Sequence, residues 1–288
     1  MSAPNVQHNV HKKTWFITGA SAGFGRILTE QLLAAGHLVA ATARKPETLS
    51  DLSEKFPGQI ITPHLDVTNT DSIRGAFNQT LNSFNHIDVL INNAGYGHVG
   101  VIEEVNDQEV RDQFEVNVFG LLNVTRPILA HMRERRSGTI LNISSIAGLT
   151  SGATFPIYCA SKHAVEAISE GLHASVKDFG VRSILIEPGA FRTRFADRAS
   201  LRTSENKIAD YKPMIDDTFQ WIKDITGQQE GDPEKACAAM INVALEENPP
   251  LRLLLGEDAW IRANDKLNQL KSDFDRNETV TRSMAYDN

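Results

Sequence analysis

A glycine-rich turn reads Thr18-Gly19-Ala20-Ser21-Ala22-Gly23-Phe24-Gly25. A short apolar run, 15–18, precedes it, and leucines at helical spacing follow over 27–35, so the sequence predicts strand, turn and helix in succession. At such a turn, backbone N–H groups and the positive end of the helix dipole can hold a pyrophosphate, because glycine leaves no side chain in the way. The same residues would also suit a turn that is merely tightly packed, so the rest of the chain has to decide between the two interpretations.

Strands and helices alternate along the rest of the chain. Predicted strands cover 38–42, 60–65, 89–91, 139–143, 181–186 and 251–255, and predicted helices cover 46–55, 71–84, the region around 110–132, 158–179 and 232–246. This alternation is typical of a parallel, doubly wound sheet flanked by helices. The predicted fold class is α/β, a single-domain Rossmann-type sheet with a partly helical substrate flap.

The predicted organisation is one compact domain with additions at its ends. Residues 1–13 read as a flexible leader, 14–256 as the Rossmann-type catalytic domain, and 257–288 as a helical C-terminal extension. The alternation lapses over 189–231, a stretch that is too long for a simple connection and carries several aromatic residues. We expect the flap in this stretch.

Composition excludes several classes of protein. The 288 residues are 41% hydrophobic with a formal net charge of -7, and the basic residues form no stripe along a phosphate backbone, so nucleic acid is not an expected partner. Cys159 and Cys237 have no Cys or His at metal-ligand spacing, which argues against a zinc site and a disulfide framework. The first residues lack the apolar region of a secretory signal, and no apolar run approaches the roughly 20 residues of a membrane-spanning helix. We expect a cytoplasmic protein with no metal and no membrane contact.

Six short motifs, in the same order, resemble those of the short-chain dehydrogenase/reductase family. The glycine-rich turn is similar to the family's T-G-x-x-x-G-x-G. The other matching elements are Asn92-Asn93-Ala94-Gly95, Asn117, Ser145, Tyr158-x-x-x-Lys162, and Pro188-Gly189 with Thr193. The resemblance spans residues 13–193 and implies a carbonyl-reductase-like oxidoreductase with a dinucleotide cofactor.

Tyr158 and Lys162 are the expected centre of the chemistry. They lie four residues apart on one helix face, and the lysine cation is expected to lower the pKa of the phenol from about 10 toward the working pH. Tyr158 is then the general acid that protonates a carbonyl oxygen. Ser145 is expected to polarise that oxygen; Ser144 is the alternative, and the family's interval to the tyrosine favours Ser145. The resemblance implies that Asn117 positions a water that relays protons to Lys162, where the residues alone favour a helix cap or kink.

The end of the second predicted strand decides the cofactor. An NAD-dependent enzyme places a carboxylate there against the ribose 2′-hydroxyl, whereas this chain has Thr42, followed by Arg44, which can hold a 2′-phosphate. The predicted cofactor is NADP (NADPH); alternatively, Arg44 and Lys45 form only a solvated entrance to the next helix. Asp66 and Val67 resemble the family's adenine contacts. The residues expected to bind the cofactor are Gly19, Ser21, Gly23, Phe24, Gly25, Arg44, Asp66, Val67, Asn93, Ala94, Gly95, Tyr158, Lys162, Pro188, Gly189 and Thr193.

The leading hypothesis is NADPH-dependent reduction of a ketone or aldehyde, with Lys162 also fixing the nicotinamide ribose. Two alternatives stay open: a non-catalytic NADP-binding sensor of the same fold, and a dehydratase or epimerase. The expected partners are a small carbonyl or alcohol substrate of apolar character and further copies of the chain. The family commonly pairs the helices near 110–132 and 158–179, so a homodimer or homotetramer is expected.

Overall fold

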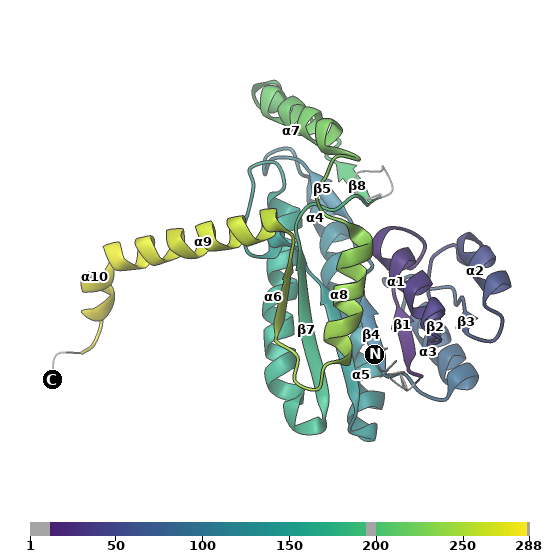
Figure 1. Ribbon diagram of the computed structural model, residues 1–288. Coiled ribbons are helices and arrows are strands. Elements are labelled where there is room, and N and C mark those ends of the chain that lie inside the picture. Colours follow the sequence, from purple (N-terminus) through teal and green to yellow (C-terminus); the bar gives the residue numbers. More distant parts are fainter. Residues whose placement is uncertain (1–11, 194–199, 287–288) are drawn as a thin grey trace, which may run out of the picture.

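A seven-stranded parallel sheet forms the centre of the molecule (Figure 1). In the computed structural model, which describes residues 12–193 and 200–286, the strand order is β3-β2-β1-β4-β6-β7-β9. The strands are β1 Thr14–Ile17, β2 Leu38–Ala41, β3 Ile60–Ile61, β4 Val89–Asn92, β6 Gly138–Ile143, β7 Val181–Pro188 and β9 Arg252–Leu255. The order reverses between β1 and β4, so the predicted doubly wound, Rossmann-type fold class is confirmed.

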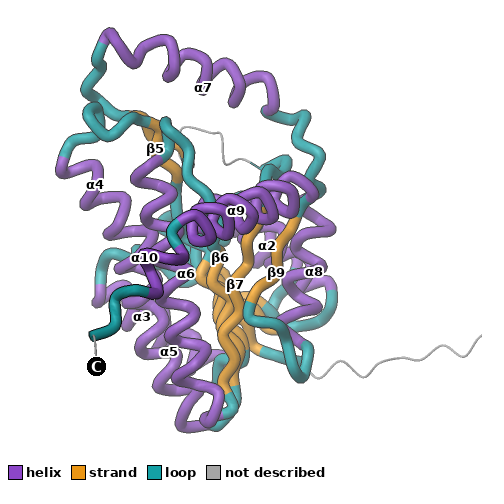
Figure 2. The backbone as a smooth tube through the Cα atoms, turned by 90° about the vertical axis from the view of Figure 1, so that its left-hand side faces the viewer, coloured by secondary structure: helices purple, strands orange, loops and turns teal. Residues whose placement is uncertain are grey.

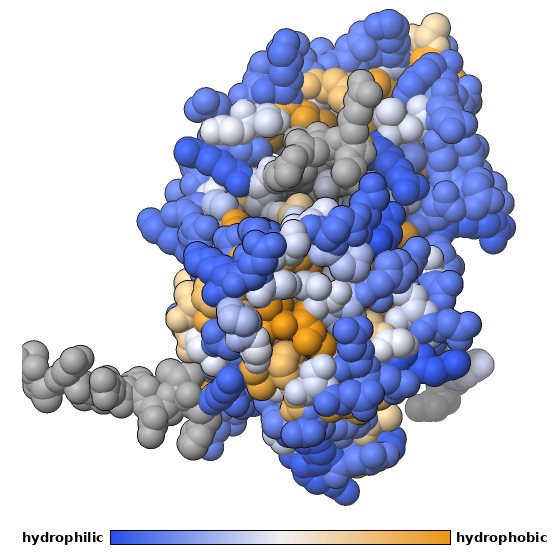
Figure 3. Space-filling model, turned by 90° about the vertical axis from the view of Figure 1, so that its right-hand side faces the viewer, coloured by the Kyte–Doolittle hydropathy of each residue, from blue (hydrophilic) through white to orange (hydrophobic). Residues whose placement is uncertain are grey.

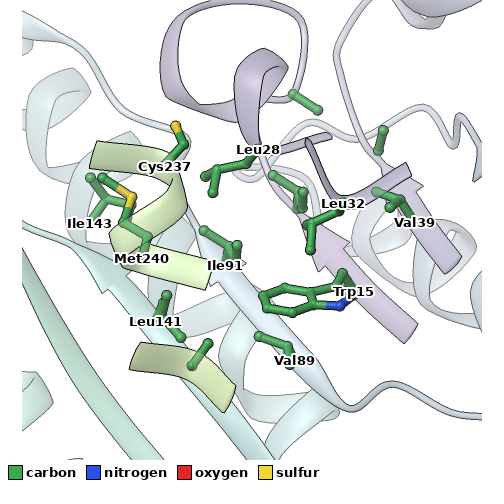
Figure 4. Packing of buried hydrophobic residues seen from close by; sticks show 14 of the residues in the cluster. Trp15, Leu28, Leu32, Val39, Val89, Ile91, Leu141, Ile143, Cys237 and Met240 are labelled. Atoms are coloured by element: carbon green, nitrogen blue, oxygen red, sulfur yellow. The ribbon is translucent and has the colours of Figure 1, made fainter. Parts of the chain in front are cut away.

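Helices cover both faces of this sheet. One layer holds α1 Gly23–Ala34, α2 Ser50–Lys55 and α8 Pro233–Leu245, and the other holds α3 Thr70–Phe84, α5 Leu121–Arg135 and α6 Pro156–Val176. Strand residues alternate accordingly: Trp15 and Ile17 pack on the first layer and Phe16 on the second. Figure 4 shows the first layer, where Leu28 of α1 and Met240 of α8 join the cluster around Trp15. Each such buried side chain contributes roughly 1.5–3 kcal/mol, and together they hold the strand ends in place.

A smaller parallel sheet and a helix lie at the top of Figure 1, and one strand of this sheet and the helix fall within 189–231, the stretch predicted as the flap. Strand β5 Gly97–Val99 pairs with β8 Leu201–Thr203, and α7 Lys212–Ile225 packs its buried Ile215 against Val99 and Val101. Strands of three residues are too short to show a period, so the sequence gives no sign of them. Phe195 and its neighbours 194–199, within the predicted flap, lie outside the described residues.

Three predicted boundaries need correction. The helical region around 110–132 is α4 Asp107–Phe114, a π-helical segment Glu115–Gly120, and then α5. The strand predicted over 60–65 shortens to β3, because Pro63 has no N–H to donate to a neighbouring strand. The helix predicted from Tyr158 begins at Pro156, whose ring suits the first turn of a helix. Short 3₁₀ turns cover Pro46–Leu49, Ile146–Gly148, Lys177–Phe179 and Ala209–Tyr211.

The chain continues after β9 into α9 Glu257–Arg276 and α10 Glu278–Arg282, which project away from the body (Figure 1). Of the predicted leader 1–13, the structure describes only Lys12 and Lys13. Figure 3 shows one face of the body, which is largely hydrophilic with hydrophobic residues gathered near its middle. Within the described ranges, no helix has both the length and the apolar character needed to cross a bilayer.

Candidate active site

A cavity of about 550 Å³ opens at the carboxyl ends of the central strands, where ligands bind in open α/β sheets. Its walls come from the glycine-rich turn, the segments after β2, β4 and β6, the first turns of α6, and α7 of the flap. All of the site residues predicted from the sequence line this cavity except Gly25 and Asn117. The fold therefore brings all but these two residues to one cavity, although they are spread over residues 19–193.

Gly19 and Gly25 give the glycine-rich turn its shape. Gly19 has a φ of 67°, in the left-handed region that favours glycine. A Cβ on Gly25 would overlap the carbonyl oxygen of Gly19, so a side chain there would push the turn and the helix apart. Helix α1 starts with no side-chain cap and no acidic residue in its first turn, which leaves its N–H groups and dipole available to an anion. These residues fit a pyrophosphate group.

Asn93 supports the turn from the end of β4. Its Nδ2 donates to the carbonyl oxygens of Thr18 and Gly19, both at 3.0 Å. The Thr18 hydroxyl oxygen in turn accepts from the backbone N–H groups of Asn93 and Ala94, both at 2.9 Å. The Asn93 side chain, which was expected to contact the cofactor, therefore holds the turn in shape, and Asn93 also lines the cavity.

Thr42, which follows β2 directly, does not occupy the predicted position beside the ribose 2′-hydroxyl. Thr42 is fully buried, and its hydroxyl donates to the carbonyl oxygen of Ile17 at 2.8 Å, so the side chain points into the sheet. Ala43 lines the cavity instead, because successive residues of an extended strand face opposite sides. The position at which a carboxylate would meet a ribose 2′-hydroxyl is therefore Ala43, which is also uncharged.

Arg44 lies on the cavity wall beside Ala43. Its side chain is exposed and, within the described part of the chain, has no hydrogen bond or ion pair. Asp66 accepts from the backbone N–H and the hydroxyl of Thr68 at 2.9 and 2.8 Å. Burial disfavours the charged form of Asp66, but these bonds and the Arg44 charge outweigh it and hold the pKa below its ordinary value. Asp66 is thus a carboxylate at neutral pH.

Tyr158 and Ser145 meet in the wall between β6 and α6, where their side chains form a hydrogen bond. Ser145 Oγ also accepts from the backbone N–H of Ala147 at 3.1 Å. Burial raises the pKa of Tyr158 to about 12, and the bond to Ser145 acts in the opposite direction. The phenol is therefore protonated at neutral pH. Ser144, the alternative to Ser145, has a buried hydroxyl without a hydrogen-bond partner among the described residues.

Lys162 lies below the phenol on the same face of α6. Its Nζ donates to the carbonyl oxygen of Ile143 at 2.7 Å and lies 6.0 Å from the centre of the Tyr158 ring. Burial lowers the pKa of Lys162 to about 8, against the opposing effect of Glu166 one turn further along. The expectation that Lys162 lowers the pKa of Tyr158 is wrong for this structure. The ammonium is directed at a backbone carbonyl, and burial of the phenol dominates.

Asn117 lies in the π-helical segment between α4 and α5. Its Oδ1 accepts from the backbone N–H of Tyr96, and its Nδ2 donates to the Tyr96 carbonyl and to Ser161 Oγ, all at 3.0 Å. The side chain thus ties the segment after β4 to α6. A helix irregularity at Asn117, which the residues alone favoured, is what the backbone shows, and such π-helical turns are frequent at functional sites.

Asp258, in the first turn of α9, is a cavity residue that sequence reasoning missed. Its Oδ2 accepts from the backbone N–H of Ala190 at 2.9 Å, so it holds the loop that follows Pro188-Gly189. An acidic residue in a first helical turn is ordinary complementation of the helix dipole, so its pattern carries no functional signal.

Glu166 and Glu187 form a second group that the sequence analysis missed. Both carboxyl groups are buried, and Arg252 of β9 lies 3.3 Å from Glu166 and 3.0 Å from Glu187. Burial and the neighbouring Glu166 charge raise the pKa of Glu187 above its ordinary value. Glu166 could have been found, because it follows Lys162 by four residues on the same helix.

Known proteins of the same fold define the class of protein to which this site belongs. A family model described as short chain dehydrogenase matches residues 13–203. This protein is an oxidoreductase that acts on CH–OH or C=O groups with a nicotinamide cofactor. It belongs to the short-chain dehydrogenase family.

Three relatives illustrate the match. The 3-ketodihydrosphingosine reductase of Bacteroides thetaiotaomicron is 38% identical over 242 residues, which cover 83% of this chain and 86% of the relative. A short-chain dehydrogenase from Streptomyces avermitilis has a solved structure that is 40% identical, with a TM-score of 0.89, 96% of this chain covered and 100% of that one. A short chain dehydrogenase from Burkholderia cenocepacia, solved in complex with NADP, is 25% identical with a TM-score of 0.71, 92% of this chain covered and 97% of that one.

Proposed function

We propose that this protein is an NADPH-dependent carbonyl reductase, which interconverts a ketone or aldehyde and the corresponding alcohol. The observation that carries the proposal is the hydrogen bond between Ser145 and protonated Tyr158, in the cavity that also contains the glycine-rich turn. The choice of NADP over NAD is supported by Ala43, which bears no carboxylate, and by Arg44, whose guanidinium is available for a 2′-phosphate.

The cofactor would lie along the cavity from α1 to α6. The N–H groups of the glycine-rich turn and of the first turn of α1 would hold its pyrophosphate, with Asn93 keeping the turn in shape. Asp66 and Val67 would flank the adenine, and Lys162 would bind the nicotinamide ribose. The Pro188-Gly189 loop would then lie against the nicotinamide. When bound, the cofactor supplies the hydride for reduction and accepts it in the reverse direction.

Tyr158 and Ser145 act together on the substrate oxygen. Ser145 donates a hydrogen bond that polarises the carbonyl group, and Tyr158 transfers its hydroxyl proton to that oxygen. The raised pKa of Tyr158 keeps this proton in place at neutral pH until the oxygen becomes basic. Lys162, positively charged below about pH 8, would supply protons to the relay that restores the phenol. The proton that Lys162 gives up is replaced through a water molecule, which we assign to Asn117 by family resemblance.

The substrate is expected to be apolar around its carbonyl group. Toward the flap, the cavity has a group of apolar side chains beside Arg202, Thr226 and Gln229; the apolar ones are Phe155, Leu201, Trp221, Ile222 and Ile225. The apolar side chains bind hydrocarbon by excluding water, and Ser145 and Tyr158 fix the orientation of the carbonyl group. The relative from Bacteroides is named for a keto substrate, which supports the same class of reaction.

The remaining assignments follow from the same reasoning. Residues 14–256 form the catalytic domain, 189–231 its flap and 257–288 an extension. We place the protein in the cytoplasm, where thiols such as those of Cys159 and Cys237 stay reduced. We also expect a homodimer or homotetramer, in which α5 and α6 pair with their copies.

Turnover of a panel of ketones and aldehydes with NADPH, followed at the nicotinamide absorbance band, tests the proposal. Tyr158→Phe should lower turnover by about 10²-fold or more and leave NADPH affinity nearly unchanged, because the hydroxyl serves proton transfer. Tyr96→Phe is the matched control, since Tyr96 lines the same cavity and has no part in the reaction. A Tyr158→Phe variant that keeps more than about a tenth of wild-type turnover would contradict general-acid catalysis.

The panel also separates the two alternatives. A non-catalytic sensor would bind NADPH and turn over no member of the panel. A dehydratase or epimerase would change the substrate without net consumption of NADPH.

A further inference from the structure

Among the described residues, the C-terminal arm, α9 and α10, contacts the body at its base. Ala259 and Ala263 of α9 are buried against Ile146, Leu149 and Leu254. Further along, the side-chain hydrogen bonds and ion pairs of the described residues 264–286 join positions within the arm itself. Figure 1 shows the arm extending to one side of the body, and in Figure 2, where that side faces the viewer, α9 lies in front of the body.

One face of α9 is nevertheless apolar along its whole length. Trp260, Ala263, Leu267, Leu270 and Phe274 follow one another at intervals of three and four residues, the spacing of a coiled-coil seam. Beyond the body this seam is open to solvent: the exposed fractions are 63% for Leu267 and 68% for Phe274. A free helical segment of roughly 13 residues is marginally stable in water, so this stretch needs a partner for its apolar face.

The charges beside the seam identify the partner. Lys266 and Asp273 lie on the same flank, and within the described part of the chain Lys266 has no ion pair. When two such helices pair antiparallel about a two-fold axis, this flank of one meets the same flank of the other. Lys266 of each copy then lies near Asp273 of the other, and Leu267 packs near Leu270. A parallel pair would instead bring Lys266 toward Lys271, which is repulsive.

We propose that α9 is a dimerisation element that pairs antiparallel with α9 of a second copy of this chain. This contact is separate from any pairing of α5 and α6, so it would join two copies of whatever assembly α5 and α6 form. It also bears on the site, because the base of the same helix carries Asp258, which holds the loop after Gly189.

Sedimentation velocity of the full chain tests the proposal. Leu267→Glu combined with Phe274→Glu should halve the mass of the assembly. The matched control is Asn268→Glu with Ser272→Glu, which adds the same charge to exposed positions on the opposite face and should leave the mass unchanged. Thermal melting and NADPH affinity, measured in parallel, show that the body remains folded. A monomeric wild type, or an apolar-face variant with the wild-type mass, would overturn the proposal.

Charge reversal tests the antiparallel geometry. Lys266→Glu and Asp273→Lys, made separately, each place like charges opposite one another twice per dimer and should raise the dissociation constant about tenfold. The two changes combined restore opposite charges and should return the dissociation constant to near the wild-type value. Single variants without effect, or a combined variant as weak as the single ones, would overturn this geometry.

Discussion

Replacing Arg44 by alanine is expected to weaken NADPH binding much more than NADH binding. The Arg44 guanidinium is exposed and has no partner in the described part of the chain, so it gives up no internal bond when it meets a 2′-phosphate. A hydrogen bond to a charged group contributes about 1.5–3 kcal/mol. The ratio of the two affinities should therefore change by roughly tenfold to a hundredfold. The nearby Asp66 carboxylate adds to the effect, since the Arg44 cation would no longer offset its negative charge.

The neighbouring positions supply the controls for Arg44→Ala. Lys45→Ala removes a cation that does not line the cavity and should change the affinity ratio little. Adding Ala43→Asp to Arg44→Ala should reverse the preference, because the new carboxylate repels the phosphate and accepts the free 2′-hydroxyl of NADH. Thr42→Asp should instead destabilise the fold, since it buries a carboxylate beside the Ile17 carbonyl. The assay is kcat/KM and Kd for both cofactors, and equal ratios in wild type and Arg44→Ala would refute the reasoning.

Carbonyl reduction should slow as the pH rises through about 8, because the buried Lys162 ammonium loses its proton there. Glu166→Gln should move this fall to lower pH, because the Glu166 charge raises the pKa of Lys162. A pH profile of kcat/KM that does not move would contradict the role of Lys162. Gly25→Ala should weaken NADPH binding at least about tenfold, because the added methyl group overlaps the Gly19 carbonyl oxygen. Calorimetric titration measures this affinity, and an unchanged value would contradict pyrophosphate binding by the glycine-rich turn. The free energy of unfolding should fall as the pH rises from about 4.5 toward 8, because folded Glu187 holds a proton that the unfolded chain has released. Urea unfolding across this pH range should show that the free energy of unfolding depends less on pH in Glu187→Gln than in the wild type. Parallel curves for the two proteins would contradict the role of Glu187.

Local patterns predicted the sheet well because each central strand is buried on both faces. Runs such as 38–41 and 89–91 are apolar without interruption, and that pattern does not depend on the partner strand. The glycine-rich turn and the Tyr158-x-x-x-Lys162 pair are equally local, since spacing along one turn or one helix decides them. These are the features that the structure brings to one cavity.

Features that depend on long-range contacts could not be predicted. The π-helical segment carries Asn117, whose side chain binds the backbone of Tyr96, 21 residues away. The side of the strand to which Thr42 points depends on the exact end of β2, where a shift of one residue exchanges the two faces. The pKa of Tyr158 depends on its burial, which no spacing of residues reveals.

The loop after Pro188 is supported by residues that a ribosome makes later than the loop itself. Gly189 donates its backbone N–H to the carbonyl oxygen of Leu255 at 2.9 Å, and Ala190 donates to Asp258. A growing chain can therefore assemble β1, β4 and the glycine-rich turn early, whereas the loop proposed to meet the nicotinamide waits for β9 and the base of α9. A chain that stops before Leu255 lacks both acceptors, so this loop loses the bonds that Gly189 and Ala190 make. The order of translation thus sets the order of assembly at this edge of the sheet.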